Sequence, residues 1–288
     1  MFTCCPIGPQ SPGTSIRTVA TERLDLSLAS SPAKRKKTIR RVENRHILPT
    51  VVGGAIRRSI ADRGLRATLG KAFWIELKRF SARGVRNIDI SRIRGIEQVN
   101  VEGSVLRHCP LVLAALGRLL ECHSVFEFGT FRGDTSWLLA HNLPDARIFT
   151  LDLPGPEAVK TAELDITDGG EYFENWDRGS RFRGTAEASR ITQLFGDSAT
   201  FDFSPYSRRM DLVYIDASHS YSYVRSDTEA ALEMLSETGT IVWDDYTYYP
   251  GLYAYLNELA PTLDRPIFHL LGTRHALYSR RDIIVPEA

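Results

Sequence analysis

Cysteine is scarce in this chain of 288 residues, and the four that occur are Cys4, Cys5, Cys109 and Cys122. No C-x-x-C pair or other metal-ligand spacing links them, which argues against a zinc ribbon or a disulfide framework. Long apolar runs are also missing, since no stretch approaches the roughly 20 residues that a membrane span needs. The sequence therefore predicts a cytoplasmic protein with reduced thiols.

Net charge is small as well, at +1, but the charges are unevenly distributed. About 20 of the 36 Lys and Arg residues and about 7 of the 35 acids precede residue 100, which leaves about +13 on the first third and about −12 on the rest. The first 30 residues lack the apolar core of a secretory signal. Residues 1–48 are rich in Pro, Ser and Thr and include a run of basic residues, so we predict a disordered basic tail.

A helical N-terminal extension is predicted for residues 49–104. Apolar residues recur at helical spacing between Val51 and Phe80, and arginines and lysines occupy much of the remaining surface. Two interpretations stay open. The helices either pack against the main domain with solvated charges or present a basic surface to an anionic membrane or nucleic acid. The first is favoured, because amphipathicity is common to surface helices.

Strands and helices alternate over residues 105–288, which we interpret as one domain. Apolar runs predict strands at 124–128, 147–151, 191–195, 212–215 and 240–243, helices at 106–122, 223–235 and 251–263, and a closing hairpin at 267–271 and 276–279. Such alternation is typical of an α/β fold with a mainly parallel sheet flanked by helices.

The most informative motif is the turn after the first of these strands, Glu127-Phe-Gly129-Thr-Phe-Arg-Gly133. A strand, a glycine turn and a helix bring backbone close to a ligand at the helix N-terminus. The next strand ends at Asp152, about 20 residues further on, where an acid is placed to accept hydrogen bonds from a ribose. The glycine spacing is not G-x-G-x-x-G, which argues against a dinucleotide such as NAD.

Acidic residues also follow three later strands. They stand in the segments Gly196-Asp197-Ser198, Asp216-Ala-Ser-His219-Ser-Tyr and Asp244-Asp245-Tyr246. The carboxyl ends of parallel strands meet at one edge of a sheet, and ligands bind there. We therefore expect these side chains to share a site with the glycine turn.

The combination resembles the class I S-adenosylmethionine-dependent methyltransferases, in particular the methyltransferase 24-like subgroup with I-D-x-x-H-S-Y and D-D-Y motifs. The resemblance covers roughly residues 105–281. It implies a Rossmann-like fold with a seven-stranded, mainly parallel sheet. It also implies transfer of a methyl group from S-adenosylmethionine, with a hydroxyl of a sugar or another small molecule as the leading acceptor.

The resemblance also assigns roles to individual residues. Those implied to contact the cofactor are Glu127, Gly129, Thr130, Gly133, Ser136, Asp152, Asp197 and Ser198. Asp216, Asp244 and Asp245 match carboxylates that hold a divalent cation such as Mg²⁺ in metal-dependent relatives, and three such acids repel unless a cation or protons offset their charge. His219 and Asp216 are the catalytic candidates, with His219 as general base. Some relatives carry an acid where this chain has Ser218.

Other interpretations remain open. A metal-independent N- or O-methyltransferase would use His219 or Asp216 directly on the acceptor. A non-catalytic binding protein would keep the fold and use its basic N-terminal region on a membrane or nucleic acid. Residues 154–190, with several aromatic and arginine side chains, form either a lid over the acceptor or a packed surface insertion.

Overall fold

The structure is a computed structural model and describes residues 14–15, 84–103, 109–164, 166, 168, 173 and 176–285. Most of the predicted basic tail and the helical pattern between Val51 and Phe80 lie outside the described residues. No described helix is long and apolar enough to cross a membrane.

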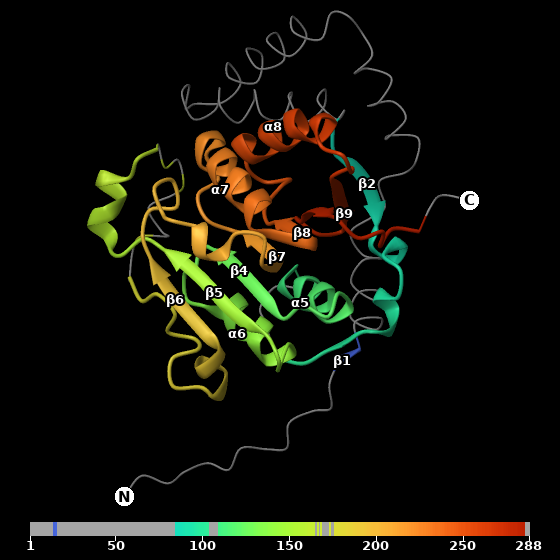
Figure 1. Ribbon diagram of the computed structural model, residues 1–288, viewed down its shortest axis with the longest axis horizontal. Coiled ribbons are helices and arrows are strands. Elements are labelled where there is room, and N and C mark those ends of the chain that lie inside the picture. Colours follow the sequence, from blue (N-terminus) through green and yellow to red (C-terminus); the bar gives the residue numbers. More distant parts are fainter. Residues whose placement is uncertain are drawn as a thin grey trace, which may run out of the picture.

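An eight-stranded sheet forms the centre of the fold (Figure 1), in the order β2-β9-β10-β8-β7-β4-β5-β6. The strands are β2 (Arg86–Asp89), β4 (Ser124–Phe128), β5 (Arg147–Asp152), β6 (Ile191–Phe195), β7 (Met210–Ile215), β8 (Leu235–Trp243), β9 (Phe268–Leu271) and β10 (Ala276–Ser279). Strand β10 pairs antiparallel with β8 and β9, and the other neighbours are parallel. The predicted α/β fold with a mainly parallel sheet is confirmed, with one strand more than expected.

The additional strand is β2, which pairs in parallel with β9 and places Ile88 opposite Leu270. Ile88 is the only buried residue of the strand, so its sequence lacks the apolar alternation by which a strand is recognised. A separate two-residue pairing joins β1 (Thr14–Ser15) to β3 (Asn100–Val101). The domain boundary at residue 104 stays a prediction, but residues 86–89 lie within the main sheet.

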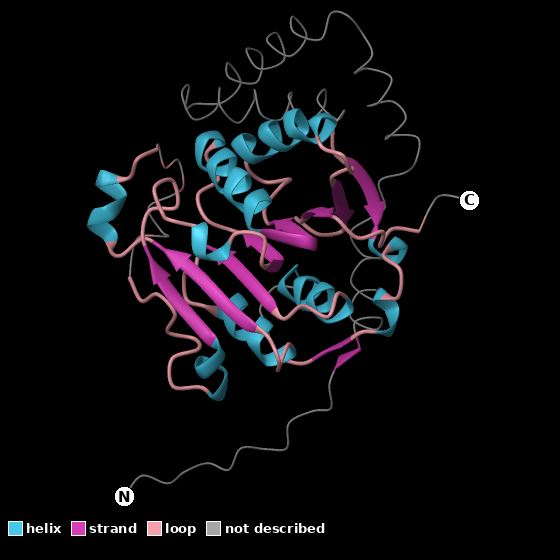
Figure 2. Cartoon of the chain, viewed as in Figure 1, coloured by secondary structure: helices cyan, strands magenta, loops and turns pink. Residues whose placement is uncertain are grey.

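Helices cover both faces of the sheet (Figure 2). The α-helices are α5 (Cys109–Leu119), α6 (Asp134–Asn142), α7 (Tyr221–Met234) and α8 (Pro250–Leu259). Helices α5 and α6 share one buried cluster with Val125, and α7 and α8 share the other with Phe126. Successive residues of a strand point to opposite faces, and both faces are buried, which explains why these strands read as continuous apolar runs.

Short 3₁₀ helices occupy the connections. They are η1 (Ile90–Arg92), η2 (Ile96–Gln98), η3 (Pro156–Thr161), η5 (Ala186–Arg190), η6 (Ser204–Tyr206) and η7 (Ala260–Thr262). Strand β4 lies between β5 and β7, so the chain leaves it toward β5 on one side and later returns to β7 on the other. Such a switch point opens a crevice at the carboxyl ends of the strands.

Candidate active site

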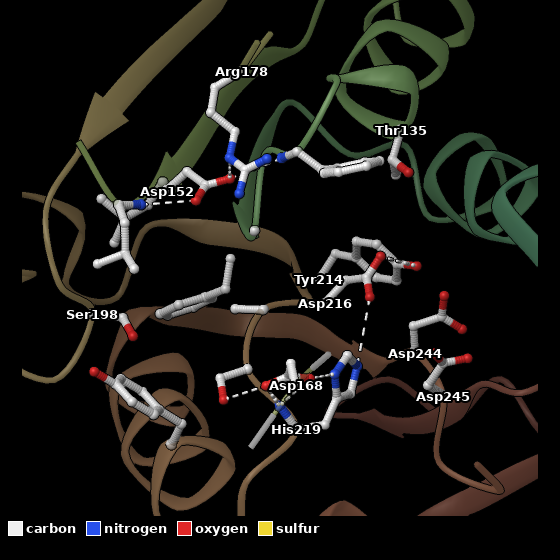
Figure 3. Close-up of a pocket in the computed structure, with 18 of the residues that line it drawn as sticks. Thr135, Asp152, Asp168, Arg178, Ser198, Tyr214, Asp216, His219, Asp244 and Asp245 are labelled. Atoms are coloured by element: carbon white, nitrogen blue, oxygen red, sulfur yellow. Dashed lines mark hydrogen bonds and ion pairs between the residues drawn. The ribbon is translucent and has the colours of Figure 1, made fainter. Parts of the chain in front are cut away.

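A cavity of about 470 Å³ opens at this carboxyl edge (Figure 3). A volume of this order suits a small-molecule ligand. The predicted site residues that line it are Gly129, Asp152, Asp197, Ser198, Asp216, His219, Asp244 and Asp245. The cavity therefore brings together strand ends that are up to 116 positions apart in the chain.

Gly129 and Gly133 both have positive φ, +92° and +85°. A Cβ on Gly129 would lie 2.1 Å from the backbone oxygen of Asp216, and one on Gly133 would lie 2.5 Å from the ring of Phe182. Both glycines are therefore required by close packing within the chain, whatever ligand binds. Gly133 also precedes the first residue of α6 as its N-cap.

Glu127, Thr130 and Ser136 are buried beneath the turn and are not among the described residues that line the cavity. Thr150 and Ser136 both donate to Oε2 of Glu127, the first at 2.7 Å, and the hydroxyls of Thr130 and Thr150 are 2.8 Å apart. Burial raises the pKa of Glu127 to about 7. This buried cluster packs beneath the glycine turn, on the side away from the cavity. Contact of these residues with a cofactor stays a prediction.

Asp152 reaches the cavity from the end of β5. Its carboxylate accepts from the backbone N–H groups of Phe131 and Leu153, each at 2.8 Å. The Nε of Arg178, from the insertion, lies 2.9 Å from Oδ2, and the guanidinium stacks on the ring of Trp176 at 3.9 Å. Burial raises the pKa of Asp152 against the opposing charge of Arg178. The insertion thus places an arginine on the acid predicted to hold the ribose.

Asp197 follows β6 and accepts hydrogen bonds from the Tyr223 hydroxyl at 2.9 Å and the Glu163 N–H at 2.7 Å. Ser198 lines the cavity beside it and lies next to Asp227 of α7, which is wholly buried. Burial raises the pKa of Asp227 from 3.8 to about 7. A protonated acid therefore lies directly behind this part of the cavity wall at mildly acidic pH.

Asp227→Asn is expected to stabilise the protein at pH 8 by about 2–4 kcal/mol. The pKa of Asp227 is raised to about 7 in the folded protein. The free energy of unfolding is therefore highest below about pH 4, where Asp227 is protonated in both the folded and the unfolded state, and it falls as the pH rises through 7. An amide never ionises, so the variant escapes this loss. Urea unfolding at pH 4 and pH 8 measures it, with the exposed Asp145→Asn as control. A variant less stable than wild type at pH 8 would contradict the buried-acid interpretation.

His219 is held in a defined orientation on the cavity wall. Its Nδ1 lies 2.7 Å from Oδ1 of Asp168, and the Ser218 hydroxyl donates to the other oxygen of Asp168 at 2.7 Å. The imidazole stacks on Tyr249, with 4.0 Å between ring centroids and 12° between planes. Burial alone would raise the pKa of Asp168, but the hydrogen bonds from His219 and Ser218 outweigh it and lower the pKa. Asp168 is therefore an ionised partner for the imidazole.

This arrangement leaves the second ring nitrogen facing the site. With Nδ1–H donated to Asp168, the lone pair is on Nε2. Nε2 is buried, has no hydrogen-bond partner among the described residues, and lies 3.8 Å from Oδ1 of Asp216. Figure 3 shows the ring between these two acids. Sequence reasoning missed Asp168, which lies 51 positions away in the insertion; no local pattern connects it to His219.

The three acids predicted as metal ligands each face a basic side chain. The pairs are Asp216 with His219 (3.8 Å), Asp244 with His275 (3.4 Å) and Asp245 with Arg274. Within the described residues, no group of three His, Cys, Asp or Glu is arranged to hold a metal ion. Arg274 offsets the charge of Asp245, and the imidazoles of His219 and His275 lie where a cation shared by the three acids would have to bind. As arranged, these residues do not fit Mg²⁺.

Asp216 is the least compensated of the three acids. Removal from water, followed by the charges of Asp244 and Asp245, raises its pKa well above the usual range. The Tyr214 hydroxyl lies 3.4 Å from its Oδ2. A protonated Asp216 carboxyl next to Nε2 of His219 can both donate and accept a hydrogen bond at the cavity surface.

Residues 126–246 match the model of a family described as a methyltransferase domain, and this range contains every predicted site residue. No curated protein sequence is significantly similar to the chain.

Three solved structures are among those similar to this chain, each with a TM-score below 0.5. A Staphylococcus aureus protein described as a caffeoyl-CoA O-methyltransferase is 14% identical, with 62% of this chain and 84% of that chain covered and a TM-score of 0.45. The O-methyltransferase TomG from Streptomyces achromogenes, in complex with SAM, is 18% identical, with 65% and 86% covered and a TM-score of 0.42. Cofactor-bound Rv0187 from MTB is 17% identical, with 65% and 86% covered and a TM-score of 0.43.

The matched range begins within β4, ends three residues after β8, and includes most of the wall of the cavity at the carboxyl edge. The chain is thus similar to a methyltransferase domain over residues 126–246, and the α/β sheet that contains this range also includes β2, β9 and β10 outside it.

Proposed function

We propose that the chain transfers a methyl group from S-adenosylmethionine to a hydroxyl of a small molecule, with His219 as the general base. The observation that carries this proposal is the Asp168–His219 pair, which directs Nε2 toward Asp216 in the wall of the cavity at the sheet's carboxyl edge. A purely structural histidine would have both ring nitrogens satisfied. A binding protein without catalysis would not need a base oriented in this way.

The cofactor is expected to lie along the ends of β4, β5 and β6. Asp152 would hold the ribose hydroxyls and Asp197 the adenine amino group, because a carboxylate accepts from both kinds of donor. Arg178 contacts the same oxygen of Asp152 as the Phe131 N–H, so the ribose must share that carboxylate with it or displace it. S-adenosylmethionine, when bound, supplies a methyl group already activated by the sulfonium.

The residues of the chain then need only align the acceptor and remove its proton. Nε2 of His219 takes the hydroxyl proton as the acceptor oxygen attacks the methyl carbon. Asp168 stabilises the imidazolium that forms, as a carboxylate does next to a protonated base. Asp216, on the other side of Nε2, is placed to bind the acceptor hydroxyl. The products are a methyl ether and S-adenosylhomocysteine.

A labelled-methyl assay tests this proposal. The full chain is incubated with methyl-labelled S-adenosylmethionine and a panel of sugars, phenols and amines, and the labelled product is identified by mass spectrometry. We expect label on an oxygen of a small molecule. We also propose that the reaction takes place in the cytoplasm. Label found only on nitrogen would support the N-methyltransferase alternative instead.

Methyl transfer is expected to proceed at an unchanged rate in excess EDTA, because Asp216, Asp244 and Asp245 already face basic side chains. The measurement compares initial rates with EDTA, with no addition and with Mg²⁺. Loss of activity in EDTA that Mg²⁺ restores would contradict this expectation and favour the metal-assisted reaction.

A further inference from the structure

A second cavity, of about 400 Å³, lies at the opposite end of the sheet from β5 and β6. Residues of β2, β9 and β10 form one wall, and residues 281–284 contribute to the other. It shares no described lining residue with the first cavity. Nothing in the proposed methyl transfer uses it.

Strand register builds the floor of this cavity. Arg86 of β2 is opposite Phe268 of β9, which is opposite Leu277 of β10, and residues in register across a sheet present their side chains on one face. The C-terminal segment is held over this floor by backbone bonds, because Val285 donates to Arg92 O and Arg94 donates to Ile283 O, each at 2.9 Å. The cavity is therefore part of the fold.

The charged residues of the lining are strongly biased to one sign. They are Arg86, Arg92, Arg265 and Arg281, against the exposed Asp282 alone. Within the described part of the chain, neither Arg86 nor Arg265 has an ion-pair partner, and Nε of Arg281 is buried without a hydrogen-bond acceptor. Clustered like charges repel, and a buried donor without an acceptor is costly. The site is thus short of negative charge.

Apolar side chains line most of the rest of the cavity, together with Asn87, Pro266 and Ser279. These apolar side chains are Ile88, Phe268, Leu277, Ile283 and Ile284. Leu277 and Ile88 belong to the main core, so this wall is rigid and continuous with the fold. Cationic and apolar surfaces therefore meet within one cavity.

We propose that this cavity binds an amphipathic anion, namely a phosphate monoester that carries an apolar group. The planar guanidinium groups suit bidentate hydrogen bonds to phosphate oxygens, and the Ile, Leu and Phe side chains receive the apolar group. The volume of about 400 Å³ accommodates a ligand of that size.

Calorimetry on the full chain with octyl phosphate tests the proposal. Inorganic phosphate probes the cationic part of the cavity alone, and the uncharged octyl glucoside probes the apolar part alone. Octyl phosphate is expected to bind one site, more tightly than either comparison probe. Arg86→Gln and Arg265→Gln should each weaken it roughly 10-fold or more. The exposed Arg147→Gln, outside the cavity, should leave affinity unchanged, and unfolding temperatures establish that all variants are folded.

Equal affinity in wild type and both cavity variants would overturn the proposal, as would octyl glucoside binding as tightly as octyl phosphate. No binding of octyl phosphate at all would also overturn it. Vesicles that contain phosphatidic acid distinguish the source of the ligand. Retention on them that is lost in Arg86→Gln identifies a lipid headgroup, and binding of octyl phosphate without retention identifies a soluble phosphate ester.

Discussion

His219→Ala is expected to lower kcat for methyl transfer by roughly 10²- to 10⁴-fold, with the Kd for S-adenosylhomocysteine nearly unchanged. Nε2 of His219 lies in the cavity wall, 3.8 Å from Oδ1 of Asp216, without a hydrogen-bond partner among the described residues. Alanine removes the proton acceptor, but it leaves Asp152 and Asp197, on which cofactor binding depends. Steady-state kinetics and calorimetry separate the two effects.

His141→Ala provides a matched control for the loss of a histidine. His141 also pairs with a carboxylate, Glu187, at 2.8 Å, and stacks on Trp137 with 20° between planes, but it does not line the cavity in the described structure. Its replacement should cost stability without a comparable fall in kcat. Wild-type kcat in His219→Ala would remove His219 from the catalytic role.

Asp168→Asn is expected to lower kcat by roughly 10²-fold or more, although Asp168 does not touch the acceptor. The carboxylate at 2.7 Å from Nδ1 fixes the tautomer that leaves Nε2 free to take a proton. An amide NH₂ in the same place donates to Nδ1 instead, which puts the proton on Nε2 and removes the base. Asp168 thus acts as a positioning residue through His219.

Two variants sharpen this test of Asp168. Asp168→Glu should recover part of the activity, because it restores a carboxylate acceptor for Nδ1–H. Asp177→Asn, in the same insertion, removes an exposed acid that pairs with Arg183 at 3.1 Å and should leave kcat unchanged. A fall in kcat that is the same in Asp168→Asn and Asp177→Asn would show a general effect of the insertion and contradict the positioning role.

The strands of the parallel sheet could be predicted because burial on both faces makes them continuous apolar runs. The segments 124–128 and 191–195 coincide with β4 and β6. Strand β8 is longer than the predicted 240–243 and begins at Leu235, since the exposed and polar positions around Glu237 conceal its first half. The helix predicted for 251–263 ends at Leu259, because Pro261 lacks the N–H that would continue it.

Site residues at strand ends could be predicted, and their partners could not. Asp168, Arg178, Arg274 and His275 all meet the predicted acids or His219 through contacts that are distant in sequence. The predicted hairpin gives a partial indication of where two of them, Arg274 and His275, lie. The second strand of the predicted hairpin, β10, pairs with β8 in the structure and places Ala276 opposite Trp243, so the residues just before β10 lie beside Asp244 and Asp245.

Calorimetric titration of the full chain with S-adenosylhomocysteine measures most directly whether the cavity at the carboxyl edge is a methyl-donor site. We expect one site per chain in the wild type, and binding lost in Asp152→Ala but kept in the exposed control Asp282→Ala. No binding by the wild type, or equal affinity in wild type and Asp152→Ala, would contradict the assignment of this cavity to S-adenosylmethionine.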